Sequence, residues 1–159
     1  MAQYLNEILL LLFIIYLGSA FGAGVYEATI VIPQWTAVPA GAGIHWNAEA
    51  ARRTDPEHKF WSFLTTVPLT LLTVASFVGA WYSVSPRREL WLGAAVVVLI
   101  ERMATFLYFT PTMGKLQNEA IRRSTVDTTV SRWISLHHVR SGVYLAAWVM
   151  ALQAWAMAK

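Results

Sequence analysis

The chain has 159 residues, of which 57% are hydrophobic and 13% are charged, and its mean hydropathy is +0.47. Soluble domains average roughly 45–50% apolar and about 25% charged residues, so this composition excludes a disordered chain, a coiled coil and an ordinary nucleic-acid-binding protein. A formal net charge of only +3 in so apolar a chain is more typical of membrane topology than of DNA binding. The absence of cysteine excludes disulfides, thiolate metal sites, iron–sulfur clusters and cysteine nucleophiles.

Four apolar segments are long enough to cross a bilayer, which requires about 20 apolar residues. They are residues 8–32, 60–82, 90–109 and 139–158. Each is predicted to be a helix, because backbone polar groups within lipid must be satisfied internally. No basic residue precedes the first segment, and its apolar stretch exceeds the ~7–15 residues of a signal-peptide core, so we expect it to stay in the mature protein. The sequence therefore predicts an all-α fold, an antiparallel bundle of four transmembrane helices forming one membrane domain, residues 1–159.

Flanking residues and prolines set the expected ends of these helices. We expect the third and fourth helices to extend over residues 87–110 and 128–158. Pro33 and Pro111 are expected to end the first and third helices, because proline has no backbone N–H and its ring clashes with the preceding turn, and Pro68 should kink the second helix. Two long connections, residues 33–59 and 111–127, then lie on one side of the membrane, and the first contains a short amphipathic segment at 46–53.

The distribution of lysine and arginine predicts the orientation. Of the 12 Lys and Arg residues, Arg87, Arg88 and Lys159 lie on the side of the N-terminus, and Arg102 lies inside the third helix. All the others lie on the side of the long connections. The positive-inside rule then places those connections in the cytoplasm. We expect a multi-pass protein of a bacterial cytoplasmic membrane.

Three ionisable side chains, Glu27, Glu101 and Arg102, lie within the predicted spans. A charge at this depth costs at least ~2.5–3.5 kcal/mol on insertion scales, which makes each a functional candidate. Adjacent helical residues point about 100° apart, so Arg102 is expected to pair with Glu27 on another helix rather than with Glu101. Two interpretations stay open: a buried ion pair that fixes helix register, or a polar pocket whose carboxylate takes up a proton.

Polar and aromatic residues at helical spacing share faces with these charges. They are Thr66, Thr70 and Thr73 on the second helix, Glu101, Thr105 and Tyr108 on the third, Trp133, His137, Arg140 and Tyr144 on the fourth, and Tyr26 beside Glu27. Such side chains commonly line sites in helical bundles. The structural alternatives are hydroxyls bonded across helices, interfacial aromatic anchors and a capping histidine. The paired Glu-x-x-His pattern of di-metal bundles is missing, so no metal site is predicted.

Three sequence motifs resemble those of a known family. They are Gly22-x-Gly24-x-Tyr26-Glu27 followed by Pro33-x-Trp35, then Arg102-x-x-Thr105-x-x-Tyr108-Phe109-x-Pro111, and Trp133-x-x-Leu136-His137-x-Val139-Arg140. With four spans, they resemble the anthrone oxygenase-like family of small integral membrane proteins. The resemblance implies a four-helix membrane fold. From the members that give the family its name, it implies insertion of oxygen from O2 into an anthrone to give an anthraquinone, without an evident metal or flavin.

The resemblance leads to a hypothesis for the site. An activated phenolic substrate reacts with O2 once a base, His137 or Glu27, has deprotonated it to a carbanion, and Arg102 or Arg140 stabilises the developing oxyanion. Tyr108 completes the catalytic candidates. Candidate substrate contacts are Tyr26, Glu101, Thr105, Trp133 and Tyr144.

Two other functions remain open. One is a non-catalytic accessory subunit of a larger electron-transfer or pigment-binding membrane complex, and the other is a small carrier or channel. The sequence specifies no cofactor. The expected partners are the lipid bilayer, a hydrophobic small molecule, and partner membrane subunits or a second copy of the chain, with no nucleic acid.

Overall fold

The structure, a computed structural model, describes residues 2–36, 46–53, 55–118, 121 and 123–157. Secondary structure in these ranges is entirely helical and forms four long rods and one short helix. The rods are α1 (Ala2–Tyr26) continued by the π turn η1 (Glu27–Val31) and α2 (Ile32–Trp35); α4 (Asp55–Trp81); α5 (Arg87–Ala104) continued by the π turn η2 (Thr105–Phe109) and α6 (Thr110–Gln117); and α7 (Arg123–Ala156). The short helix is α3 (Ala48–Arg53). The predicted all-α bundle is therefore confirmed.

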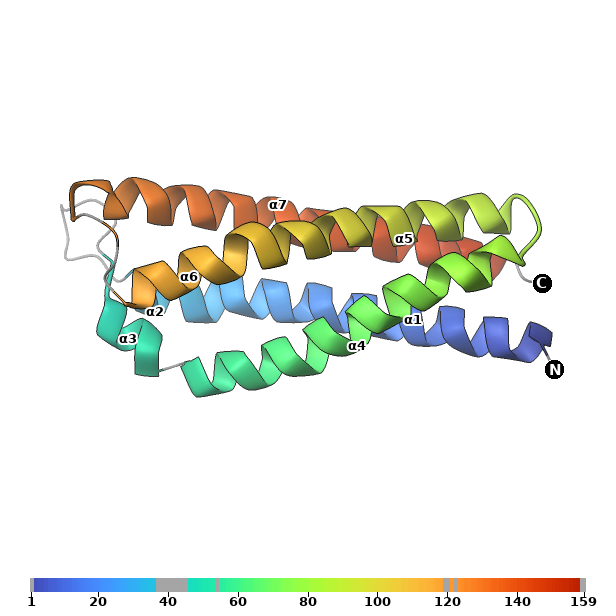
Figure 1. Ribbon diagram of the computed structural model, residues 1–159, viewed down its shortest axis with the longest axis horizontal. Helices are drawn as coiled ribbons and strands as arrows, with labels where there is room; N and C mark the ends of the chain where they lie inside the picture. The colour runs from blue at the N-terminus through green and yellow to red at the C-terminus, as the bar shows by residue number, and fades with distance from the viewer. Residues whose placement is uncertain (1, 37–45, 54, 119–120, 122, 158–159) are drawn as a thin grey trace.

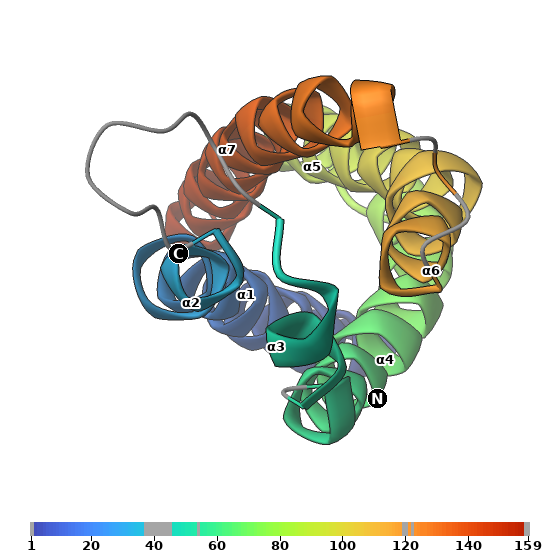
Figure 2. The same ribbon diagram turned by 90° about the vertical axis from the view of Figure 1, so that its left-hand side faces the viewer.

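The four rods lie side by side and alternate in direction, so both chain termini lie at the end where α4 connects to α5 (Figure 1). Viewed from the other end, they form a ring in the order α1, α4, α5 with α6, and α7 (Figure 2). Each long helix packs against its two neighbours in this ring. The rod of α1 and the rod of α5 and α6 therefore face each other across the bundle.

The main hydrophobic core fills the half of the bundle near the termini. Its largest fully buried side chains include Leu10, Phe13 and Trp91, which meet a row of alanines on α7. Close approach of the helices matters here: a Cβ on Gly79 would lie 2.6 Å from the Trp91 ring and 2.8 Å from Leu9. Glycine at this position lets α4 lie against its neighbours.

A second, smaller core lies at the opposite end of the bundle. It consists of Ile32, Trp35, Ala51, Phe109, Met113 and Trp133. Helix α3, which matches the expected amphipathic segment, is tied to the end of α6 because Trp46 Nε1 donates to the Leu116 carbonyl at 3.2 Å and Arg52 Nη1 donates to the Gln117 carbonyl at 2.6 Å.

The prediction that Pro33 and Pro111 end their helices is wrong. Helical structure continues to Trp35 and to Gln117, and each proline is the second residue of the segment that follows a π turn. In these turns a backbone N–H donates to the carbonyl five residues earlier, from Ile32 to Glu27 and from Thr110 to Thr105. The wider turn gives the proline ring room where a regular α-helix would clash with it. Pro68, by contrast, lies inside α4 without ending it.

The connections between the long helices are therefore shorter than predicted. Residues 33–59 contain the end of α2, all of α3 and the start of α4, and residues 111–127 contain most of α6 and the start of α7. The predicted bounds came from the apolar stretch that lipid requires, whereas the helices continue into their polar flanks. Residues 37–45, 54, 119, 120 and 122, and residue 158 of the predicted fourth helix, lie outside the described ranges.

Within the part of the chain that the structure describes, two rods are long and apolar enough to cross a membrane. They are Gln3–Trp35 and Arg87–Gln117, with mean hydropathies of 2.4 and 1.8 in their most apolar windows. The apolar part of α4, Thr65–Trp81, is shorter. The structure thus gives two candidate spans within a helical bundle, and four spans remain a prediction.

Candidate functional site

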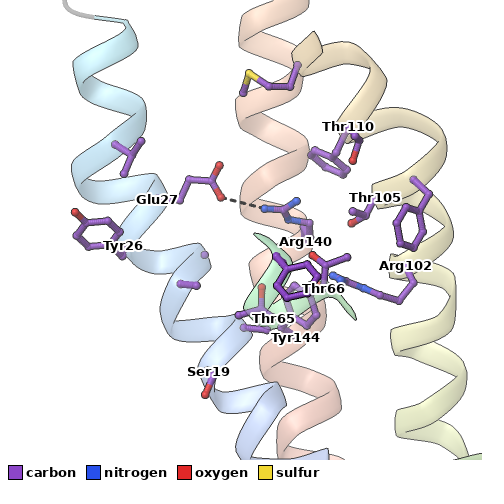
Figure 3. A pocket seen from close by; sticks show the side chains of 18 of the residues that line it. Ser19, Tyr26, Glu27, Thr65, Thr66, Arg102, Thr105, Thr110, Arg140 and Tyr144 are labelled. Atoms are coloured by element: carbon purple, nitrogen blue, oxygen red, sulfur yellow. Dashed lines mark hydrogen bonds and ion pairs between the residues drawn. The ribbon is translucent and has the colours of Figure 1, made fainter. Parts of the chain in front are cut away.

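A cavity of about 1,040 Å³ lies between the rods, in the half of the bundle near α2 and α6. Its wall takes residues from α1, η1, α4, α5, η2, α6 and α7. Sites for drug-sized ligands occupy about 300–1,000 Å³, so this one is large. Glu27, Arg102, Thr105, Arg140 and Tyr144 lie around it (Figure 3).

Part of the cavity wall lies at the outer surface of the bundle. Four large apolar side chains in its wall are substantially exposed: Tyr26 (52%), Phe63 (69%), Val67 (44%) and Phe106 (53%). They belong to α1, α4 and η2. The α4 part of the wall lies directly before Pro68, and α4 as a whole runs obliquely to the other rods (Figure 1).

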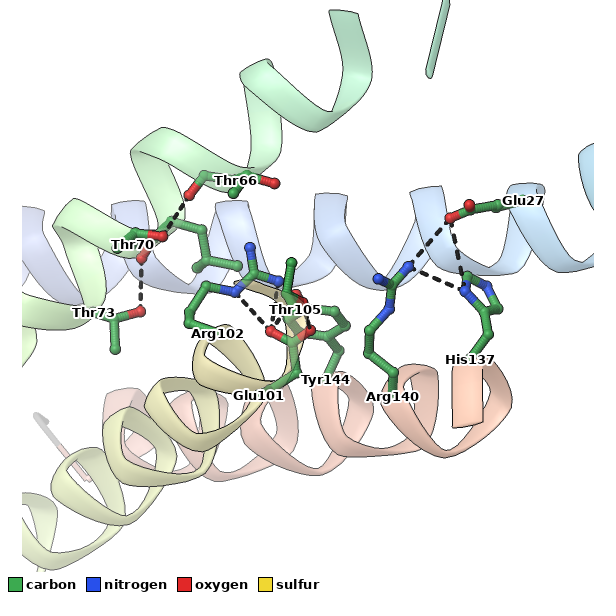
Figure 4. Close-up of polar contacts among 11 residues, drawn as sticks. Glu27, Thr66, Thr70, Thr73, Glu101, Arg102, Thr105, His137, Arg140 and Tyr144 are labelled. Atoms are coloured by element: carbon green, nitrogen blue, oxygen red, sulfur yellow. Dashed lines mark hydrogen bonds and ion pairs between the residues drawn. The ribbon is translucent and has the colours of Figure 1, made fainter. Parts of the chain in front are cut away.

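The first polar cluster in this region joins α5, η2 and α7 (Figure 4). Arg102 pairs with the adjacent Glu101, at 2.6 Å from Nε to Oε2 and 2.5 Å from Nη2 to Oε2. The prediction that these neighbours pair poorly is wrong, because the long arginine side chain curves back to the carboxylate. Thr105 and Tyr144 also donate to Glu101, each at 2.6 Å.

This cluster orients the Arg102 guanidinium. Glu101 is buried and engaged by three residues, so it acts as a support for Arg102 and is not part of the cavity wall. The guanidinium lies 5.3 Å from the centre of the Tyr144 ring and lines the cavity. No described residue accepts a hydrogen bond from its Nη1. Arg102 is 5% exposed, so these N–H groups are largely shielded from solvent and available to a molecule in the cavity.

The second polar cluster joins α1, η1 and α7 (Figure 4). Arg140 Nη2 lies 3.2 Å from Glu27 Oε2 and 3.1 Å from His137 Nδ1. His137 Nε2 lies 3.0 Å from the carbonyl oxygen of Gly24. A carbonyl only accepts and a guanidinium only donates, so Nε2 carries the proton and Nδ1 is the acceptor. Both nitrogens of a neutral His137 are therefore occupied.

Near its C-terminal end, α1 approaches the middle of α7 closely at this cluster. A Cβ on Gly24 would lie 2.9 Å from Ser141 Oγ, so glycine brings the Gly24 carbonyl within reach of His137. The Trp133 ring stacks on His137 with centroids 5.6 Å apart and planes inclined by 23°. The Arg140 guanidinium lies 4.7 Å from the centre of the Phe109 ring. His137 is fully buried behind the wall and holds Arg140 in place.

The structure brings most of the predicted site residues together. Those in the cavity wall are Tyr26, Glu27, Arg102, Thr105, Trp133, Arg140 and Tyr144. Glu101 and His137 contact them from behind, and Tyr26 contributes only at the exposed edge, where it points away from Arg140 (Figure 3). The expected pair of Arg102 with Glu27 is replaced by two separate pairs, one to Glu101 and one from Glu27 to Arg140.

Tyr108 lies elsewhere. It is half-buried against Phe109, has Arg132 6.0 Å above its ring, and lines a separate hollow of about 380 Å³. The prediction placed it on one face with Glu101 and Thr105 by regular α-helical spacing. The π turn η2 intervenes, and its smaller rotation per residue turns Tyr108 away.

Some wall residues were not predicted. Phe63, Thr65 and Thr110 belong to this group, and only a knowledge of the bundle geometry identifies them. Of the hydroxyl row on α4, Thr66 lines the cavity, whereas Thr70 and Thr73 donate to carbonyls of their own helix at 2.7 and 2.6 Å (Figure 4).

Within the described residues, no three His, Asp or Glu side chains are grouped so as to hold a metal ion. The fold and the site define a helical bundle with a large cavity next to two buried or half-buried arginine–glutamate pairs. No known family model matches the chain, and no curated protein or solved structure is significantly similar to it. The assignment of a function therefore depends on the site itself.

Proposed function

We propose that the protein is an integral membrane protein whose four rods all cross the bilayer, with the connections after α2 and α6 in the cytoplasm. Exposed apolar side chains on every rod support this arrangement. They include Leu5, Ile8 and Ile15 on α1, Leu71, Val74 and Val78 on α4, Val96 and Ile100 on α5, and Leu145, Val149 and Leu152 on α7. An apolar surface that surrounds a bundle is stable in lipid and a liability in water.

The ligand of this site is a neutral, lipophilic aromatic ketone or quinone-like molecule. Wall residues such as Phe63 and Phe106 are exposed on the surface that lipid would cover, so in this proposal a lipophilic molecule enters the cavity from the bilayer. Glu101 pairs with Arg102, Glu27 pairs with Arg140, and His137 is neutral, so the charges of these five described residues cancel. A charge-balanced site with unused N–H donors favours a carbonyl acceptor over an anion. The Arg102 donors at the cavity wall carry this proposal.

The reaction is oxygenation of an anthrone-type substrate. The Glu27 carboxylate removes a proton from the ring CH2 group, and Arg102 holds the negative charge that develops on the ketone oxygen. The resulting carbanion adds O2 and, after protonation, gives a hydroperoxide, which loses water to leave a second carbonyl group. The balance is CH2 plus O2 to C=O plus H2O, with all electrons supplied by the substrate. Glu27 is favoured over His137 as the base, because Glu27 lines the cavity and both His137 nitrogens are engaged.

The cavity also distinguishes this function from the alternatives. An accessory subunit needs only an apolar outer face, and a channel needs a continuous polar path. Neither function requires a wide cavity beside an oriented arginine. The resemblance to the anthrone oxygenase-like family suggests the same chemistry.

The test is turnover of an anthrone by the protein in lipid nanodiscs, followed by O2 uptake and anthraquinone absorbance. We expect Glu27→Gln and Arg102→Lys each to lower kcat by about 100-fold or more. Arg88→Lys, at an exposed position on α5, is the matched control and should be unchanged. Far-UV circular dichroism checks that each variant is folded. Full turnover by both site variants, or no turnover by the unmodified protein, would contradict the assigned reaction.

A further inference from the structure

A second hollow, of about 380 Å³, lies outside the main cavity, where the rod of α5 and α6 meets the N-terminal part of α7. These two segments are neighbours in the ring (Figure 2). The hollow is lined by Tyr108, Thr112, Lys115, Ile121, Thr128, Thr129 and Arg132. Two of these described residues are cations, four carry hydroxyls and none is acidic. Asp127, next to Thr128 on α7, is exposed and is not among them. The hollow is therefore positively charged and lined with hydroxyl groups.

Most of its hydrogen-bond donors are available. Among the described residues, none forms an ion pair or a hydrogen bond with the side chain of Lys115 or Arg132. The Arg132 guanidinium lies 6.0 Å from the centre of the Tyr108 ring, and this contact joins α7 to η2. Of the four hydroxyls, only that of Thr129 has a partner in the described part of the chain, the Thr125 carbonyl at 2.8 Å. Two cations and three hydroxyls can thus donate to one anionic group such as a phosphate.

The outer surface of the bundle changes from apolar to polar at this hollow. On the side toward the chain termini, Leu107 and Val139 are exposed. Val139 follows Arg132 by seven residues, so the two share a face of α7. On the side toward the connections, the exposed residues include Lys115 and Thr125. In the proposed membrane arrangement, the hollow therefore lies at the boundary between lipid tails and headgroups, on the cytoplasmic side.

We propose that this hollow binds the phosphate group of an anionic membrane lipid. Lys115 of α6 and Arg132 of α7 both donate to the phosphate, and the acyl chains lie over Leu107 and Val139. Basic pockets between membrane helices on the cytoplasmic side bind such headgroups. A soluble phosphate compound offers the same anion without the chains, so the apolar surface beside the hollow favours a lipid. The inference rests on the membrane arrangement given above and is independent of the assigned reaction.

The test is native mass spectrometry of the full chain in mild detergent, incubated with equal amounts of phosphatidylglycerol and phosphatidylcholine. We expect one phosphatidylglycerol per chain, bound about tenfold or more tightly than phosphatidylcholine. The double variant Lys115→Gln with Arg132→Gln should lose this preference. Arg53→Gln with Arg88→Gln removes the same charge at two exposed positions outside the hollow, and this matched control should keep the preference. Far-UV circular dichroism checks that both variants are folded.

Competition on the unmodified chain separates the two sources of phosphate. Glycerol 3-phosphate at about a hundredfold excess should leave phosphatidylglycerol bound, and displacement would assign the hollow to a soluble anion and overturn the proposal. Equal binding of the two lipids, or equal preference in the two double variants, would also overturn it. These outcomes leave the proposed anthrone reaction intact, whereas a chain found outside the membrane fraction of cells would overturn the membrane arrangement and this inference together.

Discussion

The buried pair of Glu101 and Arg102 offers the sharpest test of how the site is held together. Glu101→Gln removes the charge that balances a guanidinium only 5% exposed, and it weakens the acceptor for Thr105 and Tyr144. Breaking a buried pair by removing one partner costs about 3–5 kcal/mol, because the remaining charge stays buried and uncompensated. Glutamine keeps one carbonyl acceptor, so we expect a loss of about 3 kcal/mol in the free energy of unfolding.

The double variant Glu101→Gln with Arg102→Gln removes both charges together. It should be more stable than the sum of the two single variants implies, with a coupling free energy of about 2–4 kcal/mol. The assay is reversible unfolding in mixed detergent micelles, followed by far-UV circular dichroism. The exposed pair of Glu49 and Arg53, whose side chains are 68% and 79% accessible, is the matched control and should couple by less than about 0.5 kcal/mol. Equal coupling in the two pairs would refute the reasoning.

Three further predictions concern the second cluster and the membrane arrangement. His137→Ala should lower the unfolding free energy by about 2–4 kcal/mol, whereas the exposed His138→Ala should change it by less than about 0.5 kcal/mol; equal effects would contradict the positioning role. Gly24→Val should lower it by more than about 2 kcal/mol in the same unfolding assay, because a Cβ there would lie 2.9 Å from a hydroxyl on α7, and unchanged stability would contradict that packing. Cysteines introduced singly at Val84 and Asn118, in a chain with no other cysteine, should differ in labelling by an impermeant maleimide on intact cells, with only the first reacting; labelling of both or of the second alone would contradict the proposed orientation.

Much of the fold follows from hydropathy, because a backbone surrounded by apolar side chains forms helices wherever its polar groups must be satisfied internally. The ends of the helices are predicted less well from the sequence. Pro33 and Pro111 are helix breakers by their local chemistry, yet a π turn ahead of each lets the helix continue. Such turns depend on how the rods pack, which local sequence patterns do not specify.

The site residues, too, could be predicted from the sequence only in part. Helical spacing correctly grouped Thr105 with Glu101 on one face and His137 with Arg140 on another. It misplaced Tyr108, because η2 changes the rotation between residues. It also missed the pairing of neighbouring charges, since an arginine side chain is long enough to turn back on its own helix.

The cavity itself could not be predicted from the sequence. Its width depends on what surrounds a glycine in space, and Gly22 and Gly24 differ in this respect although they stand two positions apart on one helix. Only the arrangement of the rods shows that a Cβ on Gly24 would meet a neighbouring helix, whereas nothing lies within 4 Å of a Cβ on Gly22.

The central claim is that a lipophilic carbonyl compound binds beside Arg102. Equilibrium binding of anthrone to the protein in nanodiscs, measured by quenching of tryptophan fluorescence, tests it most directly. We expect saturable binding of one molecule per chain, weakened about tenfold or more by Arg102→Lys, since lysine lacks the planar set of donors, and unchanged by Arg88→Lys. Non-saturable partitioning into the lipid, or equal affinity in both variants, would contradict the claim.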